Sequence, residues 1–186
     1  MRTSTPWHFT PHGTMAVGGL TLPELLIAMA ILALLAAVAL PSFTALLERW
    51  RVHQTAQQLQ STLHYARSEA IRRSGRVVIQ KLPNHTNGCT SASTARDWDC
   101  GWIVCEDRNG DGSCGATEPV LQRIDTPARV QVARTGGSAS IAFNRWGLVS
   151  GPWLGFTLIP LDKTVSHPGA RGVCMSSGGR VRIISQ

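Results

Sequence analysis

The chain has 186 residues, of which 18 are Lys or Arg and 11 are Asp or Glu, so its formal net charge is +7. Hydrophobic residues make up 43% of the sequence and charged residues only 16%, whereas soluble domains usually contain about 25% charged residues. This composition excludes a disordered chain, a coiled coil and a collagen-like repeat. The length suits one domain of ordinary size with an additional segment.

The first distinctive segment is almost entirely apolar. It runs for 21 residues from Leu20 to Leu40, and its only ionisable side chain is that of Glu24. As a helix it is long enough to cross a hydrocarbon core of about 30 Å, so the sequence predicts a transmembrane helix. Pro41 ends the apolar stretch and is expected to kink or loosen the helix.

Small residues lie before this run and not after it. A secretory signal has its small-residue cleavage site after the apolar core, whereas here Gly18 and Gly19 precede that core. The stretch GLTLPE from Gly19 to Glu24, followed by the apolar run and by ALPSF at 39–43, resembles the class III signal of type IV prepilins and pseudopilins.

This resemblance implies that a prepilin peptidase cuts between Gly19 and Leu20 and methylates the new amine of Leu20. It also implies that Glu24 pairs with the N-terminal amine of a neighbouring subunit, because a carboxylate buried in lipid needs a partner. A plain single-pass anchor is the alternative. Met15 is an alternative start that would shorten the leader.

Four segments are expected along the chain. They are a leader peptide at 1–19, a transmembrane helix half at 20–41, a periplasmic amphipathic helix half at 42–75 and a globular β-rich domain at 76–186.

The second half of the expected helix is amphipathic and ends near Ser74 and Gly75, where glycine serves as a stop. Its apolar residues recur at steps of three and four; they are Leu46, Leu47, Trp50, Ala56, Leu59, Leu63, Ala66, Ala70 and Ile71. The helix end, ARSEAIRR from Ala66 to Arg73, leads into a strand-like VVI. This passage resembles the GspH/FimT branch of the pilin superfamily.

Beyond Gly75, short β-prone runs alternate with Gly, Pro, Asn and Asp clusters. The predicted strands are Val77–Leu82, Gly101–Cys105, Val120–Ile124, Val130–Ala133, Ser140–Phe143, Gly155–Ile159, Gly172–Met175 and Val181–Ile184. They predict an α+β, pilin-like fold in which the helix packs on one antiparallel sheet or on two. This part contains Trp98, Trp102, Trp146 and Trp153, of which two or three are interpreted as core or edge packing residues rather than as a stacking platform for a ligand.

All five cysteines lie beyond residue 88, which favours an oxidising compartment for this part of the chain. Many pairings are compatible with the sequence. Local pairing would join Cys89 to Cys100 and Cys105 to Cys114, leaving Cys174 as a free thiol buried in a strand. Because no CxxC pair is present, a zinc site is not expected.

The segment from Asp107 to Glu118 fits a calcium-loop pattern, with Asp107, Asn109, Asp111 and Glu118 at ligand positions. A strand is expected before the segment, however, and Asn-Gly and Asp-Gly are strong hairpin signals. A hairpin turn is therefore favoured over a calcium site. The histidines and serines form no catalytic set, so neither an enzyme nor a bound cofactor is expected.

Charge is polarised along the globular part. Residues 84–125 contain three basic and seven acidic side chains, whereas residues 126–186 contain seven basic side chains and one acidic side chain. In the last strand, alternation places Arg180 and Arg182 on one face, a pattern that suits phosphate binding.

The tail GGRVR, from Gly178 to Arg182, resembles the GRxR motif of FimT-like minor pilins, some of which bind DNA in natural transformation. The resemblance implies that Arg180 and Arg182 contact the phosphates of double-stranded DNA and that Gly179 allows close approach. Three further basic residues would assist them: Arg171, Arg145 and Lys163. A solvated strand face, or a contact with a neighbouring pilin, is the alternative.

Three hypotheses follow. The first is a FimT-like minor pilin of a type IV pilus, held in the bacterial inner membrane with a periplasmic domain, which assembles with other pilins and binds DNA. The second is a GspH-like minor pseudopilin of type II secretion. The third is a single-pass periplasmic calcium-binding protein.

Overall fold

The computed structural model describes residues 21–126, 129–149 and 153–185. The chain divides into two compact units that meet between Ser42 and Phe43. One helix, α1 (Leu22–Arg72), begins in the first unit and extends into the second. The helix continues through Pro41 without interruption, although proline removes one hydrogen bond from the helical ladder.

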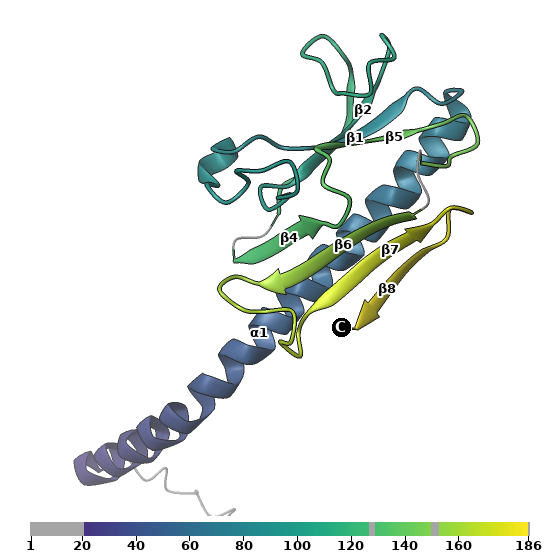
Figure 1. Ribbon diagram of the computed structural model, residues 1–186. Coiled ribbons are helices and arrows are strands. Elements are labelled where there is room, and N and C mark those ends of the chain that lie inside the picture. Colours follow the sequence, from purple (N-terminus) through teal and green to yellow (C-terminus); the bar gives the residue numbers. More distant parts are fainter. Residues whose placement is uncertain (1–20, 127–128, 150–152, 186) are drawn as a thin grey trace, which may run out of the picture. The chain divides into compact units, whose positions relative to one another are not determined.

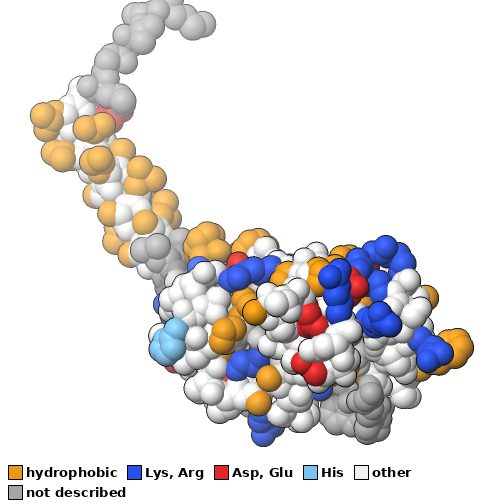
Figure 2. Space-filling view, turned by 90° about the horizontal axis from the view of Figure 1, so that it is seen from above, with side chains coloured by type: hydrophobic (Ala, Val, Ile, Leu, Met, Phe, Trp, Pro, Cys, Tyr) orange, Lys and Arg blue, Asp and Glu red, His pale blue; other side chains and the backbone are white. Residues whose placement is uncertain are grey.

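In the first unit, the large apolar side chains of α1 are exposed on the surface of the helix (Figure 2). These side chains are Leu22, Leu25, Leu26, Ile27, Met29, Ile31, Leu32, Leu34 and Leu35. Within residues 21–126, 129–149 and 153–185, no helix combines the length and hydropathy that a membrane span requires.

In the second unit, one stripe of α1 is fully buried. The buried stripe consists of Val52, Thr55, Ala56, Leu59, Thr62, Leu63, Ala66 and Ala70. Three residues predicted to belong to the apolar face are exposed instead, namely Leu46 at 60%, Trp50 at 59% and Ile71 at 54%. The apolar pattern of the sequence is therefore wider than the stripe that the sheets cover.

Within the residues that the structure describes, eight strands follow α1, and each overlaps one of the predicted strands. They are β1 (Val77–Lys81), β2 (Trp102–Glu106), β3 (Val120–Ile124), β4 (Val130–Arg134), β5 (Ser140–Phe143), β6 (Trp153–Pro160), β7 (Arg171–Ser176) and β8 (Val181–Ser185). A 3-10 turn, η1 (Thr86–Gly88), lies between β1 and β2.

The strands form two antiparallel four-stranded sheets, ordered β3-β2-β1-β5 and β4-β6-β7-β8. Both sheets lie along the second part of α1 (Figure 1). The buried stripe of the helix and apolar residues from both sheets form one hydrophobic core. This arrangement confirms the predicted α+β, pilin-like fold and selects its two-sheet form.

Two tryptophans connect the parts of this core. The indole Nε1 of Trp102 donates to Thr62 Oγ1 of α1 over 3.1 Å, so the helix and the first sheet share a buried hydrogen bond. Trp98 is fully buried, donates to the carbonyl of Ser138 over 3.2 Å and meets the Phe156 ring edge-on at 5.2 Å. Both residues are core residues, as the sequence predicts.

The helix ends where the sequence predicts a stop. Ser74 and Gly75 have φ values of 60° and 95°, and the Gly75 amide donates to the Ala70 carbonyl over 2.8 Å. Just before this end, Glu69 pairs with Arg73 at 2.7 Å. Arg73 also pairs with Glu106 of β2 at 2.5 Å, so an ion-pair chain joins the helix end to the first sheet.

We expect this chain of ion pairs to make stability fall in acid. Hydrogen bonds from Arg72 and Arg73 lower the pKa of Glu69 below its usual 4.5. A carboxyl with a lowered folded-state pKa stabilises the fold above its unfolded pKa, and this contribution is lost as the pH falls through the folded pKa. The thermal midpoint should therefore drop on acidification below about pH 4.5, and it should drop less in Glu69→Gln. An equal acid response in the variant would contradict this assignment.

Candidate nucleic-acid interface

The hairpin between β7 and β8 is a tight turn built on its glycines. The Gly179 amide donates to the Ser176 carbonyl over 2.8 Å, and the Ser176 amide donates to the Arg180 carbonyl over 3.0 Å. Gly179 has a φ of 81°, a left-handed conformation that glycine adopts without strain. The turn thereby fixes where β8 begins and which face Arg180 occupies.

Alternation along β8 separates its arginines from the core, as predicted. Val181 is 7% exposed and belongs to the core, whereas Arg180 and Arg182 are exposed on the opposite face. They line a hollow of about 500 Å³. The other residues of the hollow are Cys174, Met175, Ser176 and Ile184.

The guanidinium groups of Arg180 and Arg182 make no hydrogen bond or ion pair with any residue that the structure describes. Their positions alternate along one strand, which places them about 6.6 Å apart. Guanidinium groups bind phosphate oxygens through paired N–H donors. The strand face can therefore bind a polyanion at two adjacent points.

The resemblance implied that Gly179 allows DNA to approach closely, but its neighbour in the structure is Arg67. Its carbonyl accepts a hydrogen bond of 2.6 Å from Arg67 Nη1 of α1, and Gly179 itself is buried. A Cβ atom at this position would lie 2.5 Å from Arg67 Cζ. The close approach that glycine allows is thus made by an arginine of the helix. Arg67 positions the hairpin, a role that no local sequence pattern indicates.

Three further basic residues were predicted to assist, and the fold separates them. Arg171 begins β7 at the end remote from the hairpin turn, and its Nη1 donates to the carbonyls of Pro168 and Ala170 at 3.2 and 2.7 Å. Lys163 is exposed in the β6–β7 connection, at that same remote end. Arg171 and Lys163 therefore do not join the arginine face of the hairpin.

Arg145 lies at the hairpin end of the unit. It belongs to the turn from Asn144 to Gly147, and a Cβ on Gly147 would lie 2.6 Å from Arg67 Cγ. Arg67 therefore contacts both the 144–147 turn and Gly179. Figure 2 shows Lys and Arg side chains spread over the face of the globular unit that it draws, with several of them at one end.

The two disulfides join Cys89 to Cys100 and Cys105 to Cys114, the local pairs that the sequence suggested. Cys174 is free, as expected. Its side chain is partly exposed on the outer face of the second sheet rather than buried, because Gly155 and Arg182 are its cross-strand neighbours and neither covers it.

The predicted calcium loop connects β2 and β3, and its carboxylates bind backbone amides. Asp107 accepts from the amides of Gly110 and Gly112 at 2.7 and 3.0 Å. Glu118 accepts from Arg108 and Gly115, both at 2.7 Å, and these bonds lower its pKa. Within the described ranges, no cluster of three or more His, Cys, Asp or Glu side chains could hold a metal ion. The carboxylates of Asp107 and Glu118 therefore stabilise the loop by accepting hydrogen bonds from its own backbone amides.

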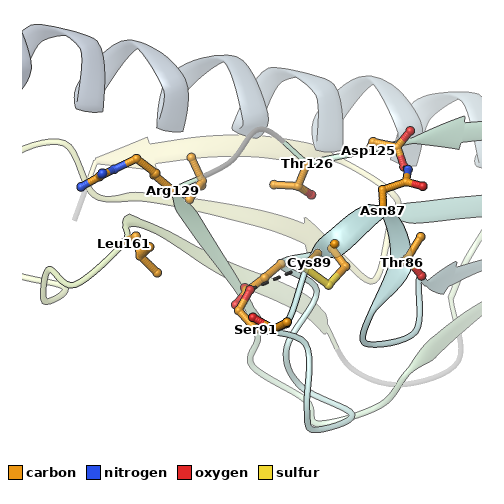
Figure 3. A pocket seen from close by; sticks show the side chains of 13 residues that line it. Thr86, Asn87, Cys89, Ser91, Asp125, Thr126, Arg129 and Leu161 are labelled. Carbon is orange, nitrogen blue, oxygen red and sulfur yellow. Dashed lines mark hydrogen bonds between the residues drawn. A yellow bond between two sulfur atoms is a disulfide. The ribbon is translucent and has the colours of Figure 1, made fainter.

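A second cavity, of about 400 Å³, lies beside the Cys89–Cys100 disulfide (Figure 3). Asn87 donates to Asp125 across 3.1 Å at one side, and Arg129 lies at another. Burial raises the pKa of Asp99 in its wall. Asn87 and Asp125 bind each other there, whereas Arg180 and Arg182 lie together on one exposed face, so the arginine face is the stronger candidate for a ligand.

The predicted processing site, Gly19 and Leu20, lies outside the described residues. Glu24 occupies the first turn of α1, where its Oε2 accepts from the Thr21 amide over 3.4 Å. In the isolated chain this carboxylate therefore serves as a cap for the helix N-terminus.

Comparison with known proteins gives matches to one family and to solved structures. A family model described as "Type II transport protein GspH" matches residues 55–179. No curated protein matches the chain in sequence.

The solved structures include the type IV minor pilin FimU of Pseudomonas aeruginosa in two crystal forms. One form is 24% identical, with 74% of this chain and 90% of that chain covered and a TM-score of 0.55. The other is 22% identical, with coverage of 71% and 91% and a TM-score of 0.53. The minor pseudopilin EpsH from the Type 2 Secretion System of Vibrio cholerae is 11% identical, with coverage of 73% and 97% and a TM-score of 0.48. The FimU likeness supports the pilin-like fold.

Proposed function

Because the chain belongs to the GspH family of type II transport proteins, we propose that it is a minor pilin that assembles into a type IV pilus and binds DNA for uptake. The observation that carries the DNA-binding part is the face of β8. There, Arg180 and Arg182 are exposed side by side without a partner among the described residues. Contacts of this kind neutralise phosphates and are independent of base sequence.

The assembly part rests on α1. Its first unit exposes a continuous apolar surface, with Leu22 at 73% and Leu34 at 70%, and such a surface needs lipid or neighbouring helices around it. We propose that residues 20–41 anchor the subunit in the bacterial inner membrane. The disulfides fit a periplasmic location for the globular unit.

Processing by a prepilin peptidase is part of this proposal. Removal of residues 1–19 would leave Leu20 as a methylated N-terminal residue. Glu24, four positions later, would exchange its cap contact for the amine of a neighbouring subunit. Intact-mass measurement of the protein from membranes should show a chain that begins at Leu20 and carries one added methyl group. An unprocessed chain would contradict this step.

We expect the variant Arg180→Ala/Arg182→Ala to lose most DNA binding. Because each phosphate contact contributes about 0.9 to the salt dependence, the slope of log affinity against log salt should fall by about two. The measurement is a salt titration of double-stranded DNA binding by the full chain in non-ionic detergent. Arg108→Ala/Arg123→Ala removes the same charge from another part of the unit and should retain the slope.

A GspH-like minor pseudopilin of type II secretion is the second candidate, and the description of the matching family favours it. In that case the chain would bind no DNA at low salt, and the arginine face would contact another pseudopilin. Deleting the gene would then block export of secreted enzymes without changing DNA uptake.

A further inference from the structure

Trp146 is the most exposed of the large apolar side chains of the globular unit within the described residues, at 71%. Tryptophan offers a large apolar surface and is normally covered in a folded domain. Trp98 and Trp102 of the same unit are fully buried. The exposure of Trp146 therefore needs an explanation other than packing in the core.

The turn that carries Trp146 is held rigidly. Asn144 Oδ1 accepts from the amides of Trp146 and Leu148 at 2.9 and 3.0 Å. The Gly147 amide donates to the Asn144 carbonyl, and the Asn144 amide donates to the Leu148 carbonyl, both at 2.9 Å. An aromatic side chain on such a turn loses little conformational freedom when a ligand covers it.

The same turn lies close to the β7–β8 hairpin, because Arg67 contacts both. A Cβ on Gly147 would come within 3.1 Å of both the Arg67 carbonyl oxygen and Ile71 Cδ1, so the turn packs directly on α1. The guanidinium of Arg67 binds the Gly179 carbonyl at 2.6 Å. One arginine side chain thus separates the tryptophan turn from the hairpin that presents Arg180.

The positive charge around the turn favours the binding of an anion. Arg145 is exposed next to Trp146 in the chain. The carboxylate of Glu69, near the end of α1, pairs with Arg72 and Arg73. The surface combines an exposed aromatic ring with positive charge, and single-stranded nucleic acids are bound by this combination.

We propose that Trp146 stacks on an unpaired base while Arg180 and Arg182 hold the neighbouring phosphates, so that the ligand of this surface is DNA with a single-stranded segment. This inference rests on the proposed DNA-binding function and specifies its substrate class. A closed duplex hides the faces of its bases, whereas every unpaired base offers a face for stacking. Arg67 is the positioning residue that keeps the two turns together.

The experiment compares three ligands of equal length with the full chain in non-ionic detergent. The ligands are single-stranded oligo(dT), the same strand with abasic sugars, and a duplex whose two ends are covalently closed. The wild-type chain should bind oligo(dT) about tenfold more tightly than the abasic strand, since stacking on one base accounts for a factor of this size. Trp146→Ala should bind both strands with the weaker affinity, and Trp146→Phe should retain most of the difference.

Trp50→Ala is the matched control, because Trp50 is also exposed, at 59%, but lies 17 residues before Arg67 on α1. This control should bind all three ligands as the wild type does. An unchanged thermal midpoint in Trp146→Ala will show that the turn still folds.

The possible failures are distinguishable. If the wild type binds none of the three ligands, the proposed DNA-binding function is wrong and the inference fails with it. If the closed duplex binds through Arg180 and Arg182 but Trp146→Ala leaves oligo(dT) affinity unchanged, only the inference is overturned. Loss of self-association in Trp146→Ala, with DNA affinities unchanged, would also overturn it and would make Trp146 a contact between subunits.

Discussion

Replacement of Trp98 by alanine is expected to lower the free energy of unfolding by about 3–5 kcal/mol, the usual cost of truncating a buried aromatic residue. Trp98 is fully buried in the hydrophobic core, and its ring meets Phe156 edge-on at 5.2 Å. Alanine would leave a cavity and would also leave the Ser138 carbonyl without the indole donor. Chemical denaturation followed by far-UV circular dichroism measures the change.

Two variants separate the causes of this loss. Trp98→Phe retains most of the volume but removes the indole N–H, so it should cost about 1–2 kcal/mol, near the value of one buried hydrogen bond. Trp146→Ala removes the same side chain from an exposed position and should change stability by less than about 0.5 kcal/mol. A Trp98→Ala protein as stable as Trp146→Ala would show that Trp98 is not part of the core.

Replacement of Gly101 by alanine is expected to cost about 2–5 kcal/mol, from left-handed backbone strain together with overpacking. Gly101 has a φ of 96°, and a Cβ atom there would lie 3.0 Å from Asp125 Cα and from the Thr126 amide nitrogen. These are backbone atoms just after β3, so they cannot rotate away. The collision would separate β2 from β3 where Trp102 pairs with Ile124.

Gly88→Ala is the control for this prediction. Gly88 has a φ of 79°, similarly left-handed, but a Cβ there would meet nothing within 4 Å. It should cost only the backbone strain, about 1–2 kcal/mol. The difference between the two thermal or chemical midpoints measures the collision alone. Equal losses at the two positions would contradict the predicted clash between β2 and β3.

The sequence predicts the secondary structure of the globular unit well because its signals are local. The run Ser140–Phe143 is a strand with the predicted bounds, and the helix stop at Ser74 and Gly75 depends on the left-handed conformation that glycine favours. The local disulfide pairs follow for the same reason, since each closes a short loop.

Features that depend on distant residues could not be predicted in this way. Arg67 and Gly179 are 112 residues apart, and no local pattern shows that one binds the other. Arg171 and Arg180 are both basic and near in sequence. Arg171 lies at the start of β7, however, whereas Arg180 lies beyond the other end of this strand. The exposure of Trp146 depends on how its turn packs on α1, and this packing cannot be predicted from amino-acid composition.

The calcium-like segment shows another limit. Its sequence fits a metal loop at each ligand position, yet Asp107 and Glu118 direct their oxygens to backbone amides. The backbone N–H groups of a short loop have no partner in a neighbouring strand, so they need other hydrogen-bond acceptors. The carboxylates of the loop supply these acceptors. The same residue types at the same spacing can therefore either bind a metal ion or accept hydrogen bonds from the loop's own amides, and the spacing alone does not distinguish these two roles.

The position of β8 at the end of its sheet has a consequence for solubility. An edge strand can pair with the edge of another chain and start aggregation, and charged residues on the strand oppose this. With Arg182 on β8 and Arg180 immediately before it, two identical edges would bring four positive charges together. The arginines would thus keep free subunits apart before they are incorporated into a filament, and a variant without them would leave an edge composed mainly of valine and isoleucine.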